Sequence, residues 1–287
     1  MTRILITGAN SYIGMSLERW LYNRPEQYQI DTIDMIDGTW MEKDFSVYDV
    51  VFHVAGIAHV SSDRKMESFY YKVNRDLAVE TARKSKADGV KQFIFMSSII
   101  VYGDSSLINS KRVIDQNTVP KPENHYGNSK LQAEAGIQIL QEAHFNVVVL
   151  RPPMIYGIGS KGNYPKLAQL ARKLPIFPDI DNERSMLYID NLCEFIRLMI
   201  DNKEKGVFFP QNSEYVKTSE MVRIIAEAYG KKIRLVKIFN PFVIMVSHRL
   251  NVLNKVFGNF TYKEEMSEYK SNYRIFSLKQ SIMITEG

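Results

Sequence analysis

The sequence predicts an α/β protein whose core is an open, doubly wound sheet of parallel strands. Three observations carry this prediction. Short apolar runs alternate with longer amphipathic segments through the first half of the 287-residue chain, the first run ends in a glycine-containing turn, and no repeat or low-complexity tract interrupts the pattern. Strands that alternate with helices pair in parallel through right-handed crossovers, which places helices on both faces of the sheet.

Each element is predicted from the spacing of its apolar residues. Short apolar runs indicate buried strands, and apolar positions three and four apart indicate helices. In chain order, we expect a strand at 3–7, a helix at 12–22, strands at 29–34 and 49–55, a helix at 69–86, a strand at 92–97, a helix at 126–142 and a strand at 146–151.

The pattern is less regular after Arg151, where prolines interrupt it. Helices are still expected at 165–173, 190–202 and 218–229. We assign residues 1–160 to the sheet domain and 161–287 mainly to a smaller C-terminal lobe, from which the chain can cross back into the first domain. Open α/β sheets bind ligands at the carboxyl ends of their strands. A lobe that covers this edge is therefore expected to bind substrate.

Composition narrows the class of protein. Hydrophobic residues make up 45% of the chain and charged residues 24%, as in ordinary globular proteins. The single cysteine, Cys193, excludes an internal disulfide and a cysteine-rich zinc module. The histidines (His53, His59, His125, His144 and His248) lack metal-ligand spacing, so we predict no metal. No apolar run approaches a membrane span or a signal peptide, and we expect a cytoplasmic protein.

The formal net charge of +5 comes from the C-terminal part of the chain. Residues 231–287 contain ten Lys or Arg and four Glu, so this segment carries +6 and the rest about −1. We interpret the excess as a solvated basic face and predict no nucleic-acid partner. Within it, residues 242–257 could form a basic amphipathic helix on a membrane surface or pack within the small lobe.

The first turn has the features of a dinucleotide site. Thr7 ends the first strand, and the residues Gly8, Asn10, Ser11, Tyr12, Ile13 and Gly14 lead into a helix. A turn of this kind directs backbone N–H groups and the positive end of the helix dipole at a pyrophosphate. Asp34 follows Gly14 by twenty residues, where a carboxylate can bind ribose hydroxyls. No Arg or Lys lies between Asp34 and Lys43, which favours NAD without excluding NADP.

A second group of residues suggests proton transfer. Tyr126 and Lys130 are four residues apart and share one helix face. A nearby ammonium and an oxidised nicotinamide would favour the phenolate form of the tyrosine, which is otherwise a poor base at neutral pH. Ser98 ends the strand at 92–97 and could bind the same reacting oxygen.

Together these motifs resemble the extended short-chain dehydrogenase/reductases, in particular the NAD-dependent epimerase/dehydratase group that acts on nucleotide sugars. The motifs are Thr7-Gly8 with Gly14, Asp34, His53-Val-Ala-Gly56, Asn74, Ser97-Ser98 with Val-Tyr-Gly103, Tyr126-x-x-x-Lys130, Arg151-Pro-Pro with Tyr-Gly157, and more loosely Arg184 to Asn191. The resemblance implies a Rossmann-type fold with Tyr126 as acid/base, Lys130 lowering its pKa and binding the nicotinamide ribose, and Ser98 positioning the substrate oxygen.

The resemblance also implies the remaining contacts. Val54, Ala55, Gly56, Asn74, Ser97 and Pro153 would line the cofactor, Arg184 would bind the nucleotide diphosphate of a sugar substrate, and the protein would be a homodimer. Two residues depart from the family pattern. Ser11 stands in place of the middle glycine, and Met154 stands where many 4-epimerases carry Asn.

Three functions follow from these motifs. The first is a UDP-hexose or UDP-N-acetylhexosamine 4-epimerase that works through a 4-keto intermediate. The second is a 4-ketoreductase that uses external NAD(P)H, which the Met154 departure favours. The third is a non-catalytic dinucleotide sensor, which the presence of both Tyr126 and Lys130 opposes. A dehydratase is disfavoured because Ile99 and Ile100 follow Ser98, where that reaction usually needs an acid and a base.

Overall fold

The chain folds into two compact units in a computed structural model that describes residues 1–58, 67–104, 106–108 and 110–287. The first unit comprises residues 1–103, 119–152 and 192–210, and the second comprises residues 104–118, 153–191 and 211–287. The chain passes between the units several times. Residues 192–210 belong to the first unit although they follow the boundary expected near residue 160.

The first unit is built on a sheet of six parallel strands, which confirms the predicted fold class. The strands are β1 (Thr2–Thr7), β2 (Tyr28–Ile33), β3 (Val50–His53), β4 (Gln92–Met96), β6 (Asn146–Leu150) and β10 (Gly206–Phe208). Their order is β10-β6-β4-β3-β1-β2, and every neighbouring pair is parallel. The order reverses between β1 and β3, which is the position where open sheets of this kind bind ligands.

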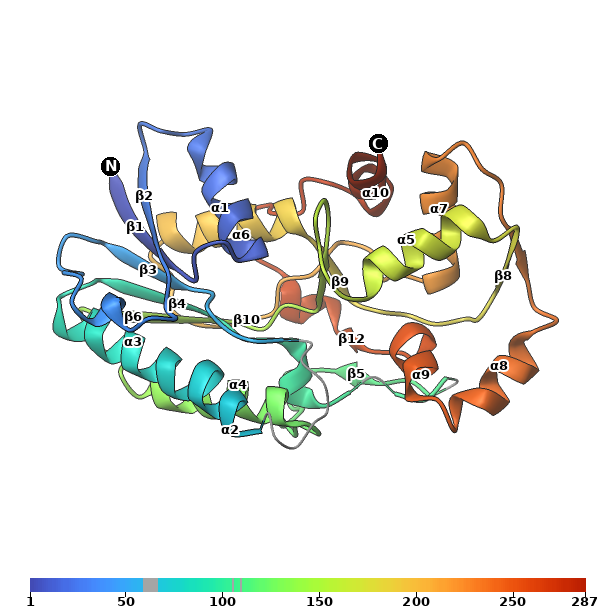
Figure 1. Ribbon diagram of the computed structural model, residues 1–287, viewed down its shortest axis with the longest axis horizontal. Helices are drawn as coiled ribbons and strands as arrows, with labels where there is room; N and C mark the ends of the chain where they lie inside the picture. The colour runs from blue at the N-terminus through green and yellow to red at the C-terminus, as the bar shows by residue number, and fades with distance from the viewer. Residues whose placement is uncertain (59–66, 105, 109) are drawn as a thin grey trace. The chain divides into compact units, whose positions relative to one another are not determined.

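Helices cover both faces of this sheet (Figure 1). The helices α1 (Tyr12–Tyr22) and α6 (Ile189–Asp201) lie on one face, and α3 (Leu77–Ala87) and α4 (His125–Gln138) lie on the other. The single helix expected at 69–86 is divided into α2 (Glu67–Tyr70), a π-helical turn at Tyr71–Asp76 and α3. The helix expected at 126–142 ends four residues earlier, at Gln138. Short 3-10 turns occur at Thr39–Met41 and Ile99–Tyr102.

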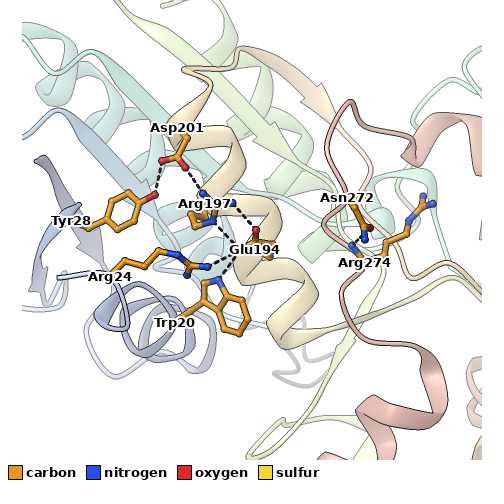
Figure 2. Close-up of polar contacts among 8 residues, drawn as sticks. All are labelled: Trp20, Arg24, Tyr28, Glu194, Arg197, Asp201, Asn272 and Arg274. Atoms are coloured by element: carbon orange, nitrogen blue, oxygen red, sulfur yellow. Dashed lines mark hydrogen bonds and ion pairs between the residues drawn. The ribbon is translucent and has the colours of Figure 1, made fainter. Parts of the chain in front are cut away.

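A polar cluster fixes α6 to the start of the first unit (Figure 2). Trp20 Nε1 donates to Glu194 Oε2 at 3.1 Å, and Tyr28 OH donates to Asp201. Arg197 bridges Glu194 and Asp201 along one side of α6. These contacts explain why the chain returns to the sheet after residue 191 and adds β10 at its edge.

The second unit contains short strand pairs and packed helices. The pairs are β5 (Val113–Ile114) with β12 (Thr261–Tyr262), β7 (Met154–Tyr156) with β9 (Met186–Tyr188), and β8 (Ile176–Pro178) with β11 (Arg234–Val236). The helices α5 (Asn163–Lys173) and α10 (Leu278–Glu286) pack against α7 (Thr218–Ala228), and a 3-10 turn occupies Glu264–Ser267. The buried Tyr156 hydroxyl bonds Ser281 of α10 at 2.6 Å.

The segment 242–257 is not one helix. It forms α8 (Asn240–Ser247) and α9 (Asn251–Phe257), which pack against each other. Phe257 is buried, whereas Phe242 and Met245 are 63% and 62% exposed. Both helices belong to the second unit, and α8 is the more exposed of the two. No helix in the described part of the chain has the length and apolarity needed to cross a bilayer.

Candidate active site

The turn after β1 has the shape that its glycines predict. Gly8 has φ +95°, and a Cβ at this position would lie 2.8 Å from the backbone of Ala55. Only glycine fits both the conformation and the close approach. The N–H groups of Gly8 and Ala9 donate to the Ile33 carbonyl at 2.9 and 3.0 Å. The turn is thereby held against the end of β2, immediately before Asp34.

Ser11, which replaces the middle glycine of the family pattern, has a structural role. It is the N-cap of α1, and its hydroxyl accepts from the Gly14 N–H at 3.2 Å. A Cβ on Gly14 would lie 2.6 Å from this hydroxyl and 3.1 Å from Ile6. Asn10 precedes the cap with φ 65°, and Tyr12 and Ile13 begin the helix. The first helical turn therefore keeps its backbone donors at the end of β1, where a pyrophosphate would fit.

Asp34 lies at the end of β2, in the position expected for a ribose contact. Its side chain is exposed and accepts from the Ile36 N–H at 2.9 Å. The first cation after it, Lys43, lies over the Tyr48 ring at 5.5 Å. A dinucleotide fits this edge because the glycine cradle, the helix start and the carboxylate follow adjacent strands of one sheet.

The loop after β3 is held by Asn74, which lies in the π-helical turn. The Asn74 side chain accepts from the Ile57 N–H at 2.9 Å and donates to the Ile57 carbonyl at 3.0 Å. This clamp fixes the backbone that follows Val54, Ala55 and Gly56. Isolated π-turns often mark functional positions in helices, and here the turn carries the residue that shapes the loop.

Sequence reasoning gave His53 no role. It is fully buried at the end of β3, and its Nδ1 lies 2.8 Å from the Thr7 hydroxyl. Its Nε2 has no hydrogen-bond partner among the described residues. Burial lowers the pKa of His53 to about 3, and the nearby Lys130 charge acts in the same direction. The imidazole is therefore neutral at physiological pH.

Ser98 and Tyr126 come together because the start of α4 packs closely on the turn after β4. A Cβ on Gly127 would lie 2.7 Å from the Ile100 carbonyl, so this glycine permits the approach. The Ser98 side chain lies beside that of Tyr126, near enough to act on its pKa. Burial raises the pKa of Tyr126 to about 12, and the Ser98 side chain opposes that rise. The hydroxyl is therefore protonated at neutral pH, and it lies beside the expected positioning residue.

Lys130 lies one helical turn after Tyr126, with its ammonium buried. Its Nζ donates to the Met96 carbonyl at 2.8 Å and lies 4.7 Å from the centre of the Phe95 ring. A Cβ on Gly56 would lie 3.3 Å from this nitrogen, so the ammonium borders the loop after β3. Desolvation lowers the pKa of Lys130 to about 8. The lysine thus keeps its charge at pH 7. It lies beside Gly56, whose backbone is predicted to line the cofactor.

A buried polar network joins α4 to the ends of β4 and β6, and the sequence analysis did not predict it. The Glu134 carboxylate accepts from the Ser97 hydroxyl and from the Arg151 guanidinium, and Arg151 Nη1 donates to Tyr102 OH at 2.7 Å. Ser97 and Arg151 follow β4 and β6, so the network ties two strand ends to the helix that carries Tyr126 and Lys130. Ser97 therefore has a positioning role, besides its predicted place beside the cofactor. The only signal in the sequence was the spacing of four between Lys130 and Glu134.

Pro153 and Arg184 belong to the second unit. Arg184 lines a pocket together with Met154, Asn163, Met186 and Lys255. Its guanidinium donates to the Gly258 carbonyl at 2.9 Å, and no carboxylate among the described residues lies within ion-pair distance of it. Desolvation lowers the pKa of Arg184 to about 10, well above neutrality. Arg184 is therefore a buried cation beside a small, mostly apolar cavity of about 10 Å³, which has room for about one water molecule.

No group of three His, Cys, Asp or Glu side chains among the described residues is arranged to hold a metal ion. Four of the histidines considered from the sequence are described, and His59 lies outside the described residues.

With this geometry in place, comparison with known proteins shows the family. Residues 4–209 match the model of the NAD dependent epimerase/dehydratase family, and the chain belongs to that family. It is an NAD(P)-dependent enzyme of the extended short-chain dehydrogenase/reductase type, whose members include nucleotide-sugar epimerases and reductases. Solved structures that share the fold contain NAD or NADPH.

Two curated relatives and one solved structure illustrate the range of similarity. A UDP-glucose 4-epimerase of Vibrio cholerae is 32% identical over 251 residues, which cover 79% of this chain and 76% of that protein. An N-acetyl-α-D-glucosaminyl-diphospho-ditrans,octacis-undecaprenol 4-epimerase of Escherichia coli O157:H7 is 27% identical over 279 residues, covering 89% and 81%. A dTDP-4-dehydrorhamnose reductase of Clostridium acetobutylicum has the same fold, with a TM-score of 0.76, 17% identity and coverage of 99% and 98%.

Proposed function

We propose that the protein is an NAD-dependent 4-epimerase of a UDP-hexose or UDP-N-acetylhexosamine and that it works through a 4-keto sugar. The observation that carries the proposal is that Ser98 lies beside Tyr126 at the start of α4, with Lys130 one helical turn further along the same helix. The Vibrio cholerae relative, a UDP-glucose 4-epimerase, supports this choice of reaction.

Each residue of the pair has a distinct part in the proposal. Tyr126 takes the proton of the C4 hydroxyl and later returns it, while Ser98 holds the same oxygen in place. Because burial raises the pKa of Tyr126, the phenolate needs nearby positive charge to form at neutral pH. The Lys130 ammonium supplies part of that charge. When bound, the nicotinamide supplies the hydride acceptor and donor.

The dinucleotide is held by the turn and loops of the first unit. Gly8, Asn10, Ser11, Tyr12, Ile13 and Gly14 would hold the pyrophosphate, and Asp34 the adenine-side ribose. Val54, Ala55, Gly56, Asn74 and Ser97 are proposed to line the remaining surface, whereas Pro153, which the sequence also suggested, belongs to the second unit. We propose NAD as the preferred form because the exposed Asp34 carboxylate would repel a 2′-phosphate.

Arg184 is the proposed contact of the substrate diphosphate. It is a desolvated cation without a carboxylate partner among the described residues, and it lines a pocket of the second unit. A guanidinium can meet two phosphate oxygens at once, which suits a diphosphate.

A 4-ketoreductase is the second candidate, and Met154 favours it. Met154 lines the Arg184 pocket where many 4-epimerases carry Asn, so the pocket wall offers an apolar thioether in place of an amide. A reductase would use the same Ser98, Tyr126 and Lys130 once per turnover. It would also have to release its cofactor after each reaction.

The two candidate functions differ in whether turnover requires added cofactor. The purified protein is denatured, the released dinucleotide is identified, and the native protein is then incubated with UDP-N-acetylglucosamine or UDP-glucose without added cofactor. An epimerase yields the C4 epimer of one of these sugars. Inertness in this assay, followed by NAD(P)H oxidation on a UDP-4-keto sugar, would establish the reductase instead. Tight NAD binding without either reaction would support the non-catalytic sensor.

We also retain the homodimer as a prediction. The helices α3 and α4 lie side by side on one face of the first unit, where relatives of this type pair, and Gly136 of α4 packs closely on Val79. Light scattering of the purified chain tests it directly.

A further inference from the structure

The helix α8 and the residues on either side of it expose an unusual amount of apolar side chain. We call this the α8 surface: Ile238, Phe239, Phe242, Met245, Leu250 and Val252, with exposed fractions of 81, 42, 63, 62, 50 and 57%. Phe242 and Met245 are three residues apart, so they lie on one side of α8, and Ile238 and Phe239 lie in the turn that precedes the helix. Large contiguous apolar patches are rare on proteins that have no partner.

This surface is displaced from the core of the second unit but is firmly anchored to it. The helix α8 packs mainly against α9 at the edge of the unit (Figure 1). Asn240 Nδ2 donates to the Asp179 carbonyl at 2.8 Å, and Asn254 Nδ2 donates to the Ser247 carbonyl at 3.0 Å. These bonds fix both ends of α8 while its apolar side chains remain in solvent. The exposure is therefore a feature of the folded unit.

The charged residues of the segment that carries the α8 surface are all of one sign. From residue 231 to 262 the sequence contains no Asp or Glu, and it contains the exposed cations Lys231, Lys232, Arg234, Lys237, Arg249 and Lys255, with His248 among them. The acidic side chains nearby, Asp179 and Asp181, share a single partner, Lys217, at 2.9 and 3.6 Å. Lys255 has a distant partner in Asp104 at 3.9 Å. The segment that carries the α8 surface is therefore net positive.

We propose that the α8 surface attaches the protein to an anionic lipid membrane. Its apolar side chains would enter the boundary between head groups and acyl chains, and the surrounding Lys and Arg would meet lipid phosphates. The alternative of a second copy is opposed by charge, because a two-fold contact would place the same cations opposite one another. The attachment is peripheral, since both helices are far shorter than a membrane span.

Co-sedimentation of the full chain with lipid vesicles tests the proposal. Vesicles of phosphatidylcholine alone are compared with vesicles in which about one-third of the lipid is phosphatidylglycerol, at low and at moderate salt. We expect the protein to sediment with the anionic vesicles, much less with the neutral ones, and less as salt rises. The variant Phe242→Ser/Met245→Ser should weaken binding by about tenfold or more, because each buried CH₂ contributes about 0.8 kcal/mol.

Matched variants separate this surface from general stickiness. Val119→Ser/Ile139→Ser removes two side chains that are 79 and 75% exposed elsewhere, and it should bind vesicles as the wild type does. Lys237→Gln/Arg249→Gln should weaken anionic binding, whereas Lys72→Gln/Lys121→Gln should not. NAD affinity, measured by calorimetry, verifies that the first unit is unaltered, and the midpoint of thermal unfolding verifies that the second unit, which carries the α8 surface, is still folded.

Several results would overturn the proposal. They are absence of sedimentation with anionic vesicles, equal sedimentation with neutral ones, and unchanged binding by Phe242→Ser/Met245→Ser. If that variant instead dissociates an oligomer and leaves vesicle binding unaltered, a second copy covers the surface and the membrane assignment is wrong. None of these results depends on whether the protein turns over a nucleotide sugar.

Discussion

The guanidinium of Arg151 meets the carboxylate of Glu134 beneath the helix that carries Tyr126 and Lys130. Arg151 Nε lies 3.1 Å from each carboxylate oxygen, and both side chains are buried. Because Glu134 is on α4 and Arg151 follows β6, this pair fixes the depth and rotation of the helix against the sheet. The pair therefore positions the residues proposed to touch substrate.

Replacing Glu134 should destabilise the first unit strongly. The variant Glu134→Gln leaves the Arg151 charge buried without a counter-charge, which typically costs about 3–5 kcal/mol. The control Glu142→Gln removes a carboxylate that is 65% exposed and pairs with Lys86, so its cost should stay below about 1 kcal/mol. Urea unfolding of both variants measures the difference, and equal costs would show that the buried pair has no special role.

Asp34 should determine the choice between NAD and NADP. The variant Asp34→Asn removes the carboxylate at the end of β2. The affinity for NAD should therefore fall about tenfold, and the ratio of NAD affinity to NADP affinity should decrease. Asp37→Asn, which changes an exposed carboxylate that accepts from Thr39, serves as the control and should bind both dinucleotides normally. Calorimetric titration gives the dissociation constants. An unaltered NAD affinity in Asp34→Asn would remove Asp34 from the site.

His53 should make the folded state sensitive to acid. Its pKa is lowered to about 3 in the folded protein, so between pH 6.5 and 3 the unfolded state binds one more proton. Stability is therefore full above pH 6.5 and falls as the pH decreases, by about 2 kcal/mol at pH 5 from this residue alone. The variant His53→Gln should show a flatter dependence in denaturant unfolding between these pH values. The exposed His144→Gln serves as control, and identical slopes for both variants would contradict the assignment.

Arg184 should affect substrate binding without affecting the dinucleotide. Loss of a charge-assisted hydrogen bond costs about 1.5–3 kcal/mol, so Arg184→Ala should raise the KM for the nucleotide sugar about tenfold or more. The KM of Arg184→Lys should lie between those of the wild type and Arg184→Ala, because lysine keeps the charge but cannot donate two parallel hydrogen bonds to a phosphate. The control Arg172→Ala removes a cation that lies over the Tyr229 ring. A raised KM in the control, or a loss of NAD affinity in Arg184→Ala, would count against the proposed role.

The parallel sheet could be predicted because its central strands are nearly continuous apolar runs. β1, β3, β4 and β6 are buried on both faces, and such strands need no polar alternation. The edge strand β10 escaped prediction because Gly206–Phe208 is too short to give a pattern. Its pairing depends on α6, whose polar anchors on α1 and β2 are more than 160 residues away in sequence.

The candidate site was predictable where the chemistry follows from local spacing. Tyr126 and Lys130 share a helix face, and the glycines of the first turn have the conformations expected of them. The π-turn at Asn74, the buried His53 and the Glu134–Arg151 pair were not predictable in the same way. Each depends on contacts between elements that are distant in sequence, and in isolation Glu134 has the pattern of an ordinary solvated helix residue.

The most direct test of the central claim is the turnover of the Tyr126→Phe variant beside its NAD affinity. General acid–base catalysis typically contributes about 10²–10⁴-fold, so epimer or reduced sugar should form at least a hundredfold more slowly while NAD binds as in the wild type. Product is followed by NMR on the substrate that the wild type converts. A Tyr126→Phe enzyme that turns over at the wild-type rate would contradict the assignment of this hydroxyl to proton transfer.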